Sequence, residues 1–107
     1  MLTKFNKRYL SFNSIPDFSK ICEIVHAKLG NDGDDEEDFI KQGQFKSAEE
    51  CAYHVYQDHS NAKGAMFHST SPEFGDCYYT TTKSVMNMHG KYTSYYSCYY
   101  RGKYFYR

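Results

Sequence analysis

The stretch SAEECAYHVYQDH, residues 47–59, carries the clearest structural signal in the chain. Ser47 and Glu50 have the spacing of a capping box, in which the hydroxyl and the carboxylate each bind an unpaired backbone N–H. Apolar residues then recur at the intervals of one helical face, namely Ala48, Cys51, Ala52, Val55, Tyr56 and His59. The pattern predicts an amphipathic helix with Cys51 in its buried stripe.

Strand-like runs lie on both sides of this helix. Residues 21–28 are rich in β-branched side chains, and residues 65–69, 76–82 and 93–100 are short runs rich in aromatic residues and Thr. Such runs, separated by turn residues, are typical of strands. We therefore expect an α+β fold, with one α-helix packed on an antiparallel β-sheet. The expected organisation is an N-terminal arm, residues 1–20, and one domain, residues 21–107.

The composition argues against general nucleic-acid binding and against a membrane span. Thirteen basic residues balance thirteen acidic ones, whereas nucleic-acid binding needs a basic surplus. No run approaches the roughly 20 apolar residues of a membrane span. The apolar content is unusual, with twelve Tyr and eight Phe in 107 residues. Tyr combines a large apolar ring with a hydroxyl that needs a partner, which favours half-buried sheets.

Four cysteines are spread along the chain: Cys22, Cys51, Cys77 and Cys98. The absence of a C-x-x-C pair argues against a zinc ribbon and a thioredoxin-like motif. An even number at wide spacing favours two disulfides and an extracellular location. The alternative is four buried thiols in a cytosolic protein. Spacing alone leaves all three possible pairings open.

The positions of these cysteines on the expected elements resemble the PAN/apple domain family. The matching residues are Cys22, Ser47-Ala48-Glu49-Glu50-Cys51-Ala52, Ala65-Met66-Phe67, Asp76-Cys77-Tyr78-Tyr79 and the run from Ser94 to Cys98. The resemblance implies the pairs Cys51–Cys77 and Cys22–Cys98, and a divergent member with two of the usual disulfides. Many members carry a further helix cysteine, and Val55 stands near that position here.

Residues 30–38 (GNDGDDEED) predict a solvated acidic loop. A loose Ca²⁺ site is the alternative, although the spacing fails the EF-hand pattern. Cys51 and His54 lie three residues apart, but a cysteine on a buried stripe is typically structural. We therefore expect no catalytic residue, no metal site and no cofactor.

The C-terminal part of the chain is aromatic and basic, with no acidic residue between 83 and 107. If Cys98 is buried in a disulfide, strand alternation points Tyr95 and Tyr99 to the other face. With Lys91, Arg101 and Lys103, these tyrosines form the expected ligand-binding face, because Tyr offers contact area at low entropic cost. The alternative is that they pair across strands and only cover the sheet.

The favoured function is a secreted or cell-surface binding module, without catalysis, that recognises a protein or carbohydrate through this Tyr/Lys/Arg face. A second hypothesis is a self-associating structural subunit of an extracellular filament or matrix, since exposed aromatic strands favour assembly. A third is a cytosolic domain with reduced cysteines that binds RNA or another partner.

Overall fold

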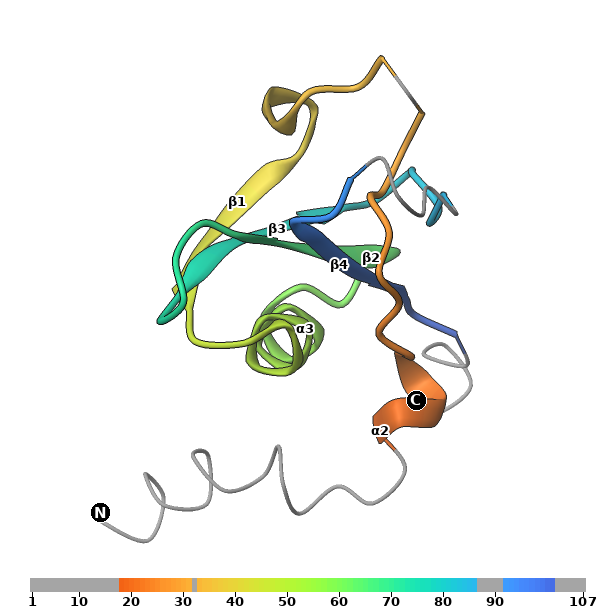
Figure 1. The fold of residues 1–107 in the computed structure, drawn as a ribbon. Helices are drawn as coiled ribbons and strands as arrows, with labels where there is room; N and C mark the ends of the chain where they lie inside the picture. The colour runs from red at the N-terminus through yellow and green to blue at the C-terminus, as the bar shows by residue number, and fades with distance from the viewer. Residues whose placement is uncertain (1–17, 32, 87–91, 102–107) are drawn as a thin grey trace, which may run out of the picture.

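Four strands form one antiparallel sheet in the computed structural model, which describes residues 18–31, 33–86 and 92–101. They are β1 (Ile40–Phe45), β2 (Gly64–Ser69), β3 (Gly75–Thr80) and β4 (Tyr95–Tyr99), in the order β1-β3-β2-β4. The helix α3 (Ala48–Asp58) covers one face of the sheet (Figure 1). Two short elements, α2 (Phe18–Ile21) and the 3₁₀ turn η1 (Glu36–Asp38), complete the described part. The expected α+β class is confirmed.

Helix α3 begins where the capping pattern predicts. The Ser47 hydroxyl accepts a hydrogen bond from the Glu50 N–H at 3.1 Å. The Glu50 carboxylate accepts from the N–H of Lys46 at 3.2 Å, one residue before the expected donor. The side chains that α3 buries are Ala48, Cys51, Ala52, Tyr53 and Val55. They join β2, β3 and β4 residues in the main apolar core.

Two disulfides fasten the elements around this core. Cys51 of α3 is bonded to Cys77 of β3, with the two Cα atoms 5.5 Å apart. Cys22, just after α2, is bonded to Cys98 of β4, with a Cα–Cα distance of 5.1 Å. Both pairs that the family resemblance implies are present, and none of the four cysteines is free. Cys51 is therefore a structural residue and has no thiol to offer as a nucleophile.

The predicted strand at residues 21–28 is wrong. Ile21 ends α2, and only Val25 pairs with β4, through two backbone hydrogen bonds with Ser97 of 2.7 and 2.8 Å. Two residues further on, the Ala27 carbonyl accepts a bond from the Ser97 side chain at 2.8 Å instead of a backbone N–H. The segment therefore touches the strand edge once and continues as a loop.

Strand β1 lies in a segment where the sequence pattern predicted no strand. Half of its residues are Lys or Gln, and it pairs with β3 at one edge of the sheet. The register shifts between Lys41 and Gly43, which is a bulge, and Gly43 has a φ of +144°. A side chain is strained at that φ, so glycine suits the position. Phe45 then stacks on His54 of α3, with ring centroids 4.8 Å apart.

A layer of loops covers the sheet face opposite α3 (Figure 1). Leu29 and Phe39 from the first loop pack on Met66 and Tyr78, which point away from the helix. Val85 joins this second cluster, and an isolated bridge pairs it with Leu29. The layer holds residues 28–31 and 33–39 against the sheet.

The described part of the expected arm contributes to the core. Phe18 is buried and packs edge-on against Tyr53 and Tyr56 of α3, with ring centroids 5.6 and 5.7 Å apart. Residues 1–17 lie outside the described residues. Neither α2 nor α3 has the length and apolar character that a bilayer crossing requires.

Candidate ligand-binding cleft

An open cleft of about 530 Å³ lies between the loop that contains η1, which we call the outer loop, and the neighbouring ends of β2 and β4. We call it the Glu36 cleft, after the residue with the most partners in it. Its lining residues are Lys28, Asp34, Asp35, Glu36, Glu37, His68, Tyr92 and Tyr95. The sheet supplies His68 and Tyr95, which stand directly opposite each other in the β2–β4 register.

The Glu36 carboxylate is held from three sides. Tyr78 donates its hydroxyl proton to one oxygen at 2.8 Å, and Tyr95 donates to the other at 2.9 Å. The Nδ1 atom of His68 also contacts the second oxygen. These three partners come from β3, β4 and β2, so Glu36 fastens η1 to three strands at once.

Glu36 remains ionised in this setting. Burial raises the pKa of its carboxyl, but the hydroxyl hydrogen bonds and the neighbouring His68 outweigh burial and lower that pKa below its usual value. Burial and the adjacent carboxylate raise the pKa values of Tyr78 and Tyr95. The hydroxyls therefore keep their protons and act as donors, which makes the arrangement a charge-assisted one.

Lys28 lines the cleft and is only 4% exposed. Its ammonium donates to the carbonyl oxygen of Asp34 at 2.7 Å. It also faces the rings of Phe39, Tyr92 and Tyr95, with its Nζ atom 5.4, 5.6 and 5.9 Å from their centroids. Cation–π contacts and carbonyl bonds together compensate the buried charge.

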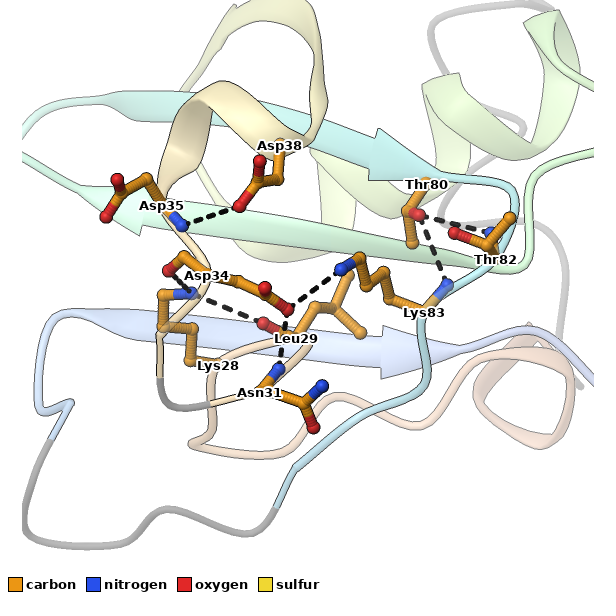
Figure 2. Close-up of polar contacts among 9 residues, drawn as sticks. All are labelled: Lys28, Leu29, Asn31, Asp34, Asp35, Asp38, Thr80, Thr82 and Lys83. Carbon is orange, nitrogen blue, oxygen red and sulfur yellow. Dashed lines mark hydrogen bonds and ion pairs between the residues drawn. The ribbon is translucent and has the colours of Figure 1, made fainter.

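Asp34 ties the outer loop to the segment after β3 (Figure 2). Its Oδ2 atom accepts from the Asn31 N–H at 2.7 Å and from the Lys83 ammonium at 3.0 Å. The backbone hydrogen bond from Asn31, and then Lys83, lower the pKa of this carboxyl. The expectation of a freely solvated loop at residues 30–38 is therefore wrong for Asp34 and Glu36. It holds for the exposed Asp35 and Glu37.

The residues of the predicted Tyr/Lys/Arg face do not form one surface in the structure. Tyr95 is half-buried and stacks on His68 in the Glu36 cleft, with ring centroids 4.3 Å apart. Tyr99 is 39% exposed and lies with Arg101 in a separate hollow of about 150 Å³. The buried Ser97 separates them, so the expected row is not continuous.

The basic residues of the predicted face are either paired or outside the described residues. The guanidinium of Arg101 donates to the carbonyl of Lys20 at 3.0 Å and to the carboxylate of Glu23 at 3.3 Å. Lys91 and Lys103 lie outside the described residues.

Sequence reasoning missed Glu36, His68, Tyr78 and Lys28 as members of one cluster. One signal was available: Cys77 faces the helix through its disulfide, so strand alternation directs Tyr78 to the opposite face. No local pattern distinguishes Glu36 from its acidic neighbours, because its two hydroxyl donors lie 42 and 59 residues away.

The cleft combines aromatic rings with fixed carboxylates, a set suited to hydrogen bonding and stacking with a ligand. Among the described residues, no three His, Cys, Asp or Glu side chains are arranged to hold a metal ion. None of the protein-family models, curated proteins or solved structures compared with the chain matches it. Membership of the PAN/apple family stays a prediction.

Proposed function

We propose that this chain is an extracellular, non-catalytic binding module that recognises a protein or carbohydrate through the Glu36 cleft. The two disulfides support an oxidising compartment, because such bonds persist outside the cytosol. A small domain fixed by covalent crosslinks also presents its surface with little conformational freedom, which lowers the entropic cost of binding.

The observation that carries the proposal is the arrangement of polar groups around Tyr95. Its hydroxyl, the Glu36 carboxylate and the His68 ring hold one another, while Tyr92 packs edge-on against Tyr95 with centroids 5.9 Å apart. The aromatic wall is thus fixed before any ligand arrives. Exposed carboxylates of Asp35 and Glu37 stand at its margin. Rings beside oriented polar groups are typical of sites that bind proteins and sugars.

The experiment screens the labelled full chain against a glycan array and a panel of immobilised extracellular protein domains. Tyr92→Ala removes a half-buried ring from the cleft, and Tyr99→Ala removes an exposed ring outside it. We expect a hit that the Tyr92 variant loses and the Tyr99 variant retains. Thermal unfolding of each variant confirms that it is folded.

Two outcomes would contradict the proposal. A hit that depends on Tyr99 and not on Tyr92 would move the site to the hollow beside Arg101. Failure to bind any member of either collection would count against the binding-module role itself.

A further inference from the structure

The Glu36 cleft carries a net negative charge, because four carboxylates line it and Lys28 is the one Lys or Arg among its lining residues. Asp34 is paired with Lys83, and Glu36 with two hydroxyls and His68. Asp35 and Glu37 are exposed, and neither forms an ion pair with another described residue. Two exposed carboxylates therefore line the same cleft as Tyr92, and they favour a ligand that combines cationic and aromatic groups.

The chain contains a segment of this kind at its far end. Residues 101–107, RGKYFYR, have three cationic side chains and three aromatic ones, and no acidic residue. The acidic residues concentrate instead in residues 32–38, which include the margin of the cleft. The two segments are complementary in charge. The C-terminal segment is itself aromatic, and the acidic segment lines a cleft that contains the rings of Tyr92 and Tyr95.

The topology makes it difficult for one molecule to fill its own cleft. β4 begins beside the cleft at Tyr95 and runs away from it, so that the backbone N–H of Arg101 bonds Ile21 at the end of α2. In Figure 1, α2 and the gold η1 turn lie at opposite ends of the molecule. The six residue steps from Tyr95 to Arg101, most of them in β4, cover about 20 Å.

The reach of the chain decides whether the C-terminal segment fills its own cleft or that of a second copy. Six residues span at most about 21 Å when fully extended, so residues 102–107 could return to their own cleft only along a straight path. A second copy meets no such restriction.

We propose that the Glu36 cleft of one copy binds residues 102–107 of a second copy. The cationic Lys103 and Arg107 lie against Asp35 and Glu37, and the aromatic side chains pack on Tyr92. This inference rests on the Glu36 cleft being a ligand site, and it specifies a protein segment as the ligand. The contact joins two different surfaces, so each copy offers both and the association is head-to-tail.

The test is a charge exchange between full-length chains, followed by sedimentation velocity over a range of concentrations. Glu37→Lys places like charges at the cleft and the tail, and Lys103→Glu does the same with the opposite sign. We expect wild type to self-associate, and each variant alone to do so about tenfold more weakly. An equal mixture of the two variants should associate again, because each cleft then meets a tail of opposite charge.

Glu73→Gln is the matched control, because Glu73 is an exposed carboxylate in the β2–β3 connection that does not line the cleft. It should associate like wild type. High salt should weaken the wild-type association, since the paired charges are exposed.

Three results would overturn the inference: a wild type that stays monomeric, association that both charge reversals leave unchanged, or a mixture that stays dissociated. The proposed function is judged separately. Loss of array binding in Tyr92→Ala, with a monomeric wild type, would leave the binding role standing and remove only the second copy as the partner.

Discussion

The Glu36 cluster offers the most direct measurement of what holds the outer loop to the sheet. Glu36→Gln keeps the shape of the side chain, but its amide has one oxygen to accept a hydroxyl and a nitrogen that cannot accept the other. A hydrogen bond to a charged group contributes about 1.5–3 kcal/mol. The Glu36 side chain is 31% exposed, so solvent screening favours the lower end of that range.

We therefore expect Glu36→Gln to lower the free energy of unfolding by about 1.5–2 kcal/mol near neutral pH. For a domain of this size, that corresponds to a fall in Tm of roughly 10 °C. Tyr95→Phe removes one of the two hydroxyl donors and should cost about 1 kcal/mol. The double variant should lose less than the sum, with a coupling energy of about 1 kcal/mol, because both changes remove the same hydrogen bond.

The pH dependence follows from the lowered pKa of Glu36. Its usual value is 4.5, and the folded protein holds it below that. The stabilisation is complete above the unfolded-state value and is lost as the pH falls through the folded-state value. The difference between wild type and Glu36→Gln should therefore be largest near neutral pH and shrink once the pH is well below 4.5.

The assay is urea unfolding followed by circular dichroism, with the disulfides intact, for wild type, the two single variants and the double variant. Glu73→Gln, an exposed carboxylate, should have no effect at either pH. A coupling energy within about 0.3 kcal/mol of zero would show that the Tyr95–Glu36 bond is not made in solution. A cost of Glu36→Gln that is the same in acid would refute the charge-assisted explanation.

Two further predictions concern the scaffold. Replacing Cys51 and Cys77 together with Ala should cost about 3.5 kcal/mol in urea unfolding, since the crosslink closes a loop with a sequence separation of 26; a cost below about 1 kcal/mol would contradict the loop-closure argument. Gly64→Ala should cost about 1–3 kcal/mol, because the added Cβ would lie 2.8 Å from the carbonyl oxygen of Cys98. Gly33→Ala, with no atom within 4 Å of its added Cβ, is the matched control and should unfold like wild type.

The elements that sequence predicted correctly are those whose local pattern and tertiary role agree. The capping residue Ser47 and the apolar stripe after it locate α3 to within one residue. The aromatic runs locate β2, β3 and β4 for the same reason, since their alternate residues face two covered sides.

The errors occur where tertiary contacts override local preference. Residues 21–28 look like a strand, but the Cys22–Cys98 bond and the Ser97 hydroxyl hold them as a loop at the edge of β4. Strand β1 escaped notice because a polar edge strand with a glycine bulge has little β signal. The cleft could be found only in part, because Tyr95 was identified but its partners depend on strand order, which the sequence does not state.

The two edges of the sheet differ in a way that limits how copies can join. Val25 occupies the open side of β4, while the other border, β1, is interrupted by the bulge at Gly43. An interrupted border is a poor template for main-chain pairing with a neighbouring molecule. Contacts between copies would then depend on side chains alone, so any assembly should dissolve reversibly in salt instead of hardening into cross-β fibrils.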